Sequence, residues 1–179
     1  MIIVGVGGAM AEEVKYTISS KNTLTATGTA PIGSSATIVE TYGTSCQMTS
    51  GNSQTLTLKG YEGYKITKLV LSMRSNKSSG SGYLFYSTDG GTTFNSIVGN
   101  AQTNAGSQFN SQNWNGSWST SYVDVTKNVD IECGNSDVVF KLHATANSLY
   151  CRSYTITYQP NPQSPSPNPP SPINTFFFK

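Results

Sequence analysis

The sequence predicts an all-β protein, an antiparallel two-sheet sandwich that is jelly-roll-like and has about eight or nine strands. Three observations support this fold class. Apolar and polar residues alternate with period two from about residue 14 to 158, and no amphipathic stretch of helical length interrupts them. Turns rich in Gly, Ser and Asn separate the alternating runs, as expected for short antiparallel strands.

Three runs in the first half of the chain predict strands, at residues 36–43, 53–60 and 64–75. In the longest of them, the odd-numbered residues of 69–73 are apolar and their neighbours are mostly polar, which is the pattern of a half-buried strand. Ile66 lies out of step with this alternation.

The second half of the chain continues the pattern. Residues 82–98 predict a hairpin, in which an aromatic strand, a turn at 89–91 and a return strand follow one another. Residues 121–133 predict one further strand, and residues 137–158 predict two more, joined through 144–148.

Both ends differ in composition from the expected domain at residues 12–159. Residues 1–11 are mostly apolar and end in Ala-Met-Ala, which predicts a secretory signal cleaved before Glu12, or alternatively a strand donated to a neighbouring copy. Residues 160–179 carry proline at nearly every second position and end in three phenylalanines followed by a lysine, which predicts an extended polyproline II tail.

Charge and the length of apolar runs exclude two classes of protein, nucleic-acid binders and integral membrane proteins. Charged residues make up 11% of the chain and the net charge is +2, without a basic stripe interleaved with aromatics. We therefore expect no nucleic-acid partner. Because the longest apolar run is far shorter than the roughly 20 residues needed to cross a bilayer, we do not expect an integral membrane protein. Low charge with many hydroxyl and amide side chains instead favours a secreted, extracellular or cell-surface protein.

The chain has few residues for metal binding or catalysis. Cys46, Cys133 and Cys151 are too widely spaced for a zinc ribbon, and His143 is the only histidine, so we expect no metal and no cofactor. In an exported protein two of the three cysteines are expected to form a disulfide, in any of three pairings; the alternative is three buried thiols. No pair of acids and no nucleophile-elbow sequence indicates an enzyme.

Residues 87–94 match the S-x-D-x-G-x-x-[WF] pattern of an Asp-box, with Ser87, Asp89, Gly91 and Phe94 at its fixed positions. In proteins with this motif the aspartate accepts backbone amides in a hairpin turn, the glycine supplies a positive φ, and the aromatic ring covers the turn. Sialidases carry several copies beside a catalytic arginine cluster, whereas this chain has one copy and two arginines. We expect a structural role.

Aromatic residues in polar loops are the best candidates for ligand contacts. Flat rings flanked by amides and hydroxyls suit sugar binding, so the predicted ligand-binding residues are Trp114, Trp118, Tyr61, Tyr64 and Asn113. The alternative is that these rings seal the open ends of the sandwich.

Two N-glycosylation sequons begin at Asn76 and Asn115. A glycan on Asn115 would stand between the two tryptophans and argue against sugar binding there.

Residues 36–82, 114–125 and 144–158 together resemble a repeated β-sandwich module of secreted and surface proteins of gut Bacteroidetes. The resemblance implies a non-catalytic extracellular accessory module, but supplies no ligand or binding residues. The three cysteines and the proline-rich tail depart from this module. The tail is instead similar to the Ser-Pro repeats of hydroxyproline-rich glycoproteins of algal and plant walls.

Two functions follow as expectations. The first is a non-catalytic extracellular binding or adhesion module for glycan or another cell-surface polymer. The alternative is a structural subunit that forms filaments or matrix, with its N-terminal strand and proline-rich tail as contacts between copies.

Overall fold

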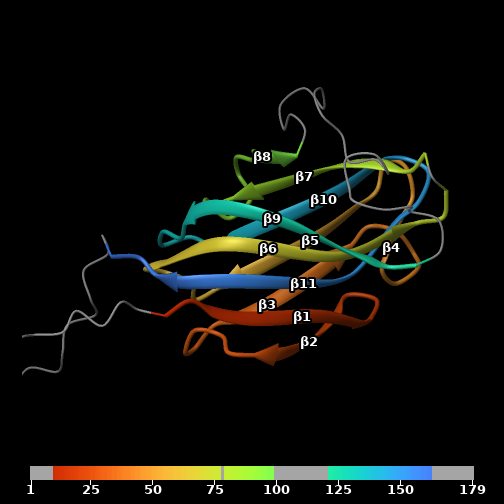
Figure 1. The fold of residues 1–179 in the computed structure, drawn as a ribbon. Coiled ribbons are helices and arrows are strands. Elements are labelled where there is room, and N and C mark those ends of the chain that lie inside the picture. Colours follow the sequence, from red (N-terminus) through yellow and green to blue (C-terminus); the bar gives the residue numbers. More distant parts are fainter. Residues whose placement is uncertain (1–9, 78, 99–120, 163–179) are drawn as a thin grey trace, which may run out of the picture.

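A computed structural model describes residues 10–77, 79–98 and 121–162, which form two antiparallel sheets packed face to face (Figure 1). The first sheet, sheet A, contains β1 (Glu12–Ser20), β2 (Thr23–Gly28), β4 (Gln47–Met48), β6 (Tyr64–Ser75), β9 (Val123–Glu132) and β11 (Leu149–Pro160). The second, sheet B, contains β3 (Ser35–Glu40), β5 (Ser53–Lys59), β7 (Ser81–Ser87), β8 (Asn95–Val98) and β10 (Val138–Ala146). The predicted all-β antiparallel two-sheet sandwich is confirmed.

The described residues form eleven strands, more than the eight or nine expected. One additional strand is β4, which has only two residues and pairs only with β11. Another is β2, an edge strand whose six residues are almost all exposed. Neither carries an alternating apolar pattern long enough to be recognised in the sequence.

The strand order shows which segments become neighbours. Sheet A runs β2-β1-β11-β6-β9 and sheet B runs β3-β5-β10-β7-β8. The first and last strands of the domain, β1 and β11, therefore lie side by side, with Glu12 opposite Tyr158.

The consecutive strands β10 and β11 lie in different sheets, and the turn between them places Asn147 at φ 55°. Asparagine tolerates this left-handed conformation better than most residues.

The core lies between the sheets and follows the predicted alternation. On β6, Leu69, Leu71 and Met73 are fully buried. Ile66 is fully buried as well, although it is out of step with them. Lys68 pairs with Thr157 and Ile66 with Tyr158, so Thr67 is an extra residue of β6 relative to β11, and this bulge returns the earlier part of the strand to the core face.

The predicted hairpin is present, since β7 pairs with β8 in antiparallel register. In its turn the Asp89 carboxylate accepts hydrogen bonds from the Ser87 hydroxyl (2.6 Å), the Thr92 amide (3.0 Å) and the Thr93 amide (2.9 Å). Gly91 adopts φ 92°. These bonds favour the ionised form and hold the pKa of Asp89 well below its usual range. The arrangement is that of an Asp-box turn, with Phe94 half-buried beside it.

Within the described residues no helix is present, and so none is available to cross a membrane.

Candidate binding pocket at one end of the sandwich

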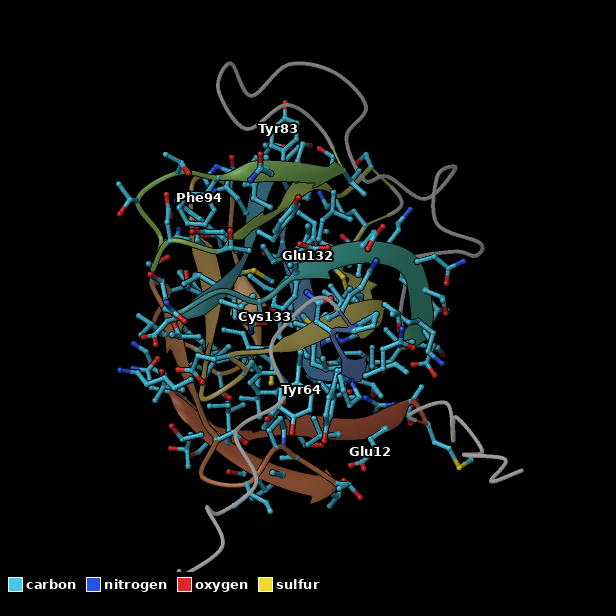
Figure 2. The ribbon with its side chains drawn as sticks, turned by 90° about the vertical axis from the view of Figure 1, so that its left-hand side faces the viewer. Glu12, Tyr64, Tyr83, Phe94, Glu132 and Cys133 are labelled. Atoms are coloured by element: carbon cyan, nitrogen blue, oxygen red, sulfur yellow. The ribbon has the colours of Figure 1, made fainter. Side chains whose placement is uncertain are left out.

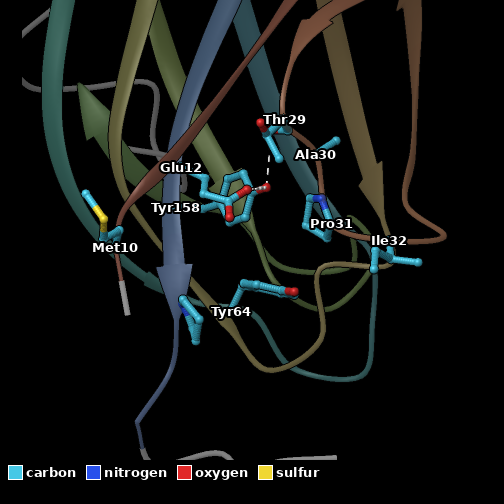
Figure 3. A pocket seen from close by; sticks show the side chains of 9 residues that line it. Met10, Glu12, Thr29, Ala30, Pro31, Ile32, Tyr64 and Tyr158 are labelled. Atoms are coloured by element: carbon cyan, nitrogen blue, oxygen red, sulfur yellow. Dashed lines mark hydrogen bonds between the residues drawn. The ribbon is translucent and has the colours of Figure 1, made fainter. Parts of the chain in front are cut away.

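A pocket of about 440 Å³ opens at one end of the sandwich (Figure 3). It lies where the start of β1, the loop from β2 to β3, the start of β6 and the end of β11 meet. Its lining residues are Met10, Glu12, Thr29, Ala30, Pro31, Ile32, Tyr64, Tyr158 and Pro160. Figure 2, which looks at the molecule from this end, shows Tyr64 and Glu12 there, and their strands β6 and β1 belong to the same sheet.

A cluster of three tyrosine rings forms the inner wall of the pocket. Tyr64 and Tyr158 pack edge to face with centroids 5.3 Å apart, and Tyr61 lies behind them, 6.5 Å from Tyr64 and 5.5 Å from Tyr158. The pairing of β6 with β11 brings them together, because it sets Tyr64 opposite Pro160 and thus beside Tyr158. Edge-to-face packing fixes the plane of the half-buried Tyr64 ring, so this ring is a rigid surface for a ligand.

Polar groups lie beside the Tyr158 ring of this wall. The Tyr158 hydroxyl donates to the Glu12 carboxylate over 3.1 Å and also lies 3.2 Å from the Thr29 carbonyl oxygen. Burial, and then the nearby Glu12 carboxylate, raise the pKa of Tyr158, so the hydroxyl keeps its proton. Glu12 is exposed and retains acceptor capacity beyond this one bond. The pocket thus combines a flat ring with carboxylate and carbonyl acceptors.

The rim of the pocket is apolar and exposed. Ile32 in the loop from β2 to β3 is fully exposed (103%), and Met10 is 85% exposed. They are two of the three large hydrophobic side chains that are exposed within the described residues. An apolar rim around polar acceptors is typical of a binding site.

The structure places the predicted ligand-binding residues in different surroundings. Tyr64 lines the pocket. Tyr61 does not offer a ring to solvent: it is 2% exposed, its hydroxyl lies 2.9 Å from that of Tyr16, and it supports the Tyr64 ring from behind. Trp114, Trp118 and Asn113 lie outside the described residues.

Of the two predicted N-glycosylation sequons, one lies within the described residues and the other does not. Asn76 follows β6 in an exposed turn, where its side-chain oxygen accepts the Ser148 amide over 3.1 Å. Asn115 lies outside the described residues.

Sequence reasoning missed Glu12, Thr29, Pro31 and Tyr158 as pocket residues. From the sequence, Glu12 is only the first position of the domain and Tyr158 only the end of a strand. Their meeting depends on the pairing of the first strand with the last, which no local pattern reveals. One weak indication exists, because Glu12 and Tyr158 lie at the two ends of the predicted domain and both carry polar groups suited to ligand contact.

The three cysteines carry free thiols. Cys133 and Cys151 are buried, and burial raises the pKa of Cys133 to about 12 and that of Cys151 further. Cys46 is half-buried. No group of three or more metal-binding side chains occurs among the residues that the structure describes.

The only histidine has a partner that sequence spacing did not predict. His143 Nδ1 lies 2.9 Å from the Ser53 hydroxyl oxygen, on the neighbouring strand β5. Burial, followed by the charge of Lys141, lowers the pKa of His143. Within residues 10–77, 79–98 and 121–162 no carboxylate bonds to this imidazole. The pair therefore lacks the orienting acid of a Ser-His-acid triad.

Neither a known family model nor a curated protein matches this chain.

Proposed function

We propose that the protein is a non-catalytic extracellular binding or adhesion module for glycan or another cell-surface polymer, and that the tyrosine-lined pocket is its ligand site. The observation that carries the proposal is the half-buried Tyr64 ring, held in place by Tyr61 and Tyr158, facing the acceptors of Glu12 and Thr29. The resemblance of the chain to a Bacteroidetes surface module supports the extracellular location.

The chemistry of the pocket suits a sugar better than a wholly apolar ligand. The apolar face of a pyranose ring stacks on tyrosine, while its hydroxyl groups donate to carboxylate and carbonyl oxygens. The Tyr64 ring supplies the first contact. The Glu12 carboxylate and the Thr29 carbonyl oxygen supply the acceptors.

A glycan array with four variants tests this proposal. Tyr64→Ala should abolish binding of the glycan found, whereas Tyr64→Phe keeps the ring and should retain it. Glu12→Gln should weaken binding by about tenfold, as expected for the loss of a charged hydrogen bond. Tyr42→Ala, at a half-buried tyrosine that does not line the pocket, is the matched control. Binding that is unchanged in Tyr64→Ala would refute the pocket as the site.

A second function is favoured by where the flanking segments leave the domain. Met10, which precedes β1, and Pro160, which ends β11, both line the pocket, and the exposed Ile32 completes its rim. A segment of a second copy placed there would cover apolar surface, as in a self-assembling filament or matrix subunit.

Assembly state separates the two functions. Native mass spectrometry and negative-stain microscopy of the full chain should give a monomer for the binding module. Polymers in the wild type would instead indicate a structural subunit. In that case Ile32→Ser should abolish the polymers and Tyr42→Ala should not.

A further inference from the structure

Four side chains at the other end of sheet A form an alternating stack of tyrosine and arginine, which we call the Arg-Tyr ladder. The guanidinium of Arg74 lies 3.8 Å from the ring centroid of Tyr150 and 5.4 Å from that of Tyr122. The guanidinium of Arg152 lies 4.4 Å from the Tyr122 centroid. The order is therefore Tyr150, Arg74, Tyr122, Arg152, with each cation over at least one ring.

Strand register builds the first part of the ladder. Arg74 on β6 pairs with Tyr150 on β11, so both side chains point away from the core at the same level. Val123 pairs with Met73, and the preceding residue, Tyr122, consequently lies beside Arg74 on its other side.

A bulge supplies the last member. Cys151 pairs with Met73 and Ser153 with Ser72, so Arg152 is an extra residue in β11 without a partner on β6. Bulges redirect side chains and are frequent beside functional sites. Here the bulge turns Arg152 over the outer face, where its Nε donates to the Ser72 hydroxyl over 3.1 Å. Ser72 is only 4% exposed although its neighbours Leu71 and Met73 point into the core.

Neither guanidinium forms an ion pair within the part of the chain that the structure describes. The ion pairs among the described residues all use lysines, and no carboxylate there lies within 4 Å of Arg74 or Arg152. These two residues are the only arginines of the whole chain. Arg152 is exposed and Arg74 half-buried; Arg152 bonds to Ser72 and Arg74 to the Tyr122 hydroxyl, and the other N–H donors of each guanidinium remain available. A guanidinium stacked on a ring is held with its N–H edge free, the geometry that suits bidentate contact with an oxyanion.

We propose that the Arg-Tyr ladder binds the carboxylate or sulfate groups of an acidic polysaccharide. The inference rests on the proposed function and goes beyond the pocket, because it assigns a second site and the charge of the ligand. Tyr150 and Pro160 stand at opposite ends of β11, ten residues and so about 30 Å apart. A polymer of several sugar units lying along sheet A is long enough to reach both sites. A nucleic acid would require a longer basic track than two arginines.

The test measures binding of the full chain to polygalacturonate, which carries carboxylates, to dextran sulfate, to neutral dextran and to oligothymidylate. Three double variants are compared with wild type: Arg74→Gln with Arg152→Gln, Arg74→Lys with Arg152→Lys, and Lys15→Gln with Lys21→Gln. The last removes the same charge from exposed lysines on β1 and its turn, and is the matched control. Thermal unfolding confirms that each variant is folded.

Wild type should bind one or both acidic polysaccharides and neither dextran nor oligothymidylate. The glutamine variant should bind at least about tenfold more weakly, since two charged hydrogen-bond donors are lost, while the control stays within about twofold. The lysine variant should also bind more weakly, because an ammonium cannot form the bidentate contact. Equal binding by wild type and the glutamine variant, a lysine variant that binds like wild type, or preference for oligothymidylate would each overturn the proposal.

This design distinguishes a failure of the ladder proposal from a failure of the pocket proposal. Loss of acidic binding in the arginine variants, with thermal unfolding unchanged, supports the ladder whatever Tyr64→Ala does to binding of the glycan found on the array. Binding that Tyr64→Ala removes and the arginine variants leave unchanged supports the pocket and overturns the ladder.

Discussion

The amide nitrogen of Cys151 donates a hydrogen bond to the carbonyl oxygen of Cys46 over 3.0 Å. The two cysteines therefore face each other one step beyond the pairs that join β4 to β11, which are Gln47 with Tyr150 and Met48 with Leu149. Facing residues of antiparallel strands have Cα atoms about 4.5–5.5 Å apart, which lies within the range of Cα separations across disulfides. Of the three pairings that the sequence leaves open, the structure favours this one.

We predict that a disulfide oxidant such as oxidised glutathione joins Cys46 to Cys151 and leaves Cys133 as a thiol. The two thiols lose two protons and two electrons, and glutathione disulfide takes them up as two reduced glutathiones. Non-reducing peptide mapping checks the pairing. Cys133→Ser should still form the bond and Cys46→Ser should not, whereas a cross-link that includes Cys133 contradicts the prediction.

Glu40 should be the most sensitive acidic residue for stability. Its carboxylate is 3% exposed and accepts hydrogen bonds from the amides of Asn22 (3.0 Å) and Cys46 (2.5 Å) and from the Gln54 side chain (3.0 Å). Glu40→Gln would place an amide donor against these donors. We expect the free energy of unfolding in urea to fall by about 2–3 kcal/mol. Glu62→Gln, at an exposed site, should leave it unchanged, and an equal loss in both variants would refute this role.

A methyl group at Gly82 should not fit. A Cβ built there would clash with the carbonyl oxygen of His143 and would lie 2.7 Å from the Leu149 side chain. Because the first contact is with backbone, Gly82→Ala should destabilise the protein by about 1–3 kcal/mol in chemical denaturation. Gly43→Ala is the control, since a Cβ placed on Gly43 would have no neighbour within 4 Å. Similar midpoints for the two variants would contradict the expected clash.

The turn of Asp89 gives a dependence on pH. Because folding lowers the pKa of Asp89, its contribution to stability is complete above the unfolded value of about 3.9 and is lost as pH falls toward the folded value. Asp89→Asn should therefore have a lower melting temperature than wild type at pH 7. The difference should shrink below about pH 4, while Asp124→Asn should show neither effect. A constant difference across this range would exclude the carboxylate as its cause.

The sequence predicted the fold class because period-two alternation is a local property of half-buried strands. Breaks in the same alternation also mark the positions of two bulges. In β11, Leu149 and Cys151 are buried at odd positions, whereas Tyr154, Ile156 and Tyr158 are buried at even ones. This change of parity marks the bulge at Arg152, and the out-of-step Ile66 marks the bulge in β6. A break in parity is therefore as informative as the alternation itself.

The pocket could be predicted from the sequence only in small part. Tyr61 and Tyr64 are equally good candidates in the sequence, and only burial distinguishes the ring that lines the pocket from the one that supports it. The pairing of β1 with β11 joins residues far apart in the chain, Glu12 and Tyr158 being separated by 146 positions. Local patterns carry no information about such a contact.

That pairing also determines how the domain responds to force. The chain enters β1 and leaves β11 at the same end, because Glu12 stands opposite Tyr158 in antiparallel register. Tension applied through both flanking segments separates these strands like a zipper, one hydrogen-bonded pair at a time, instead of shearing many pairs at once. The first pair to part carries the bond from Tyr158 to Glu12 and one wall of the pocket. We therefore expect tension to open the pocket before it opens the core.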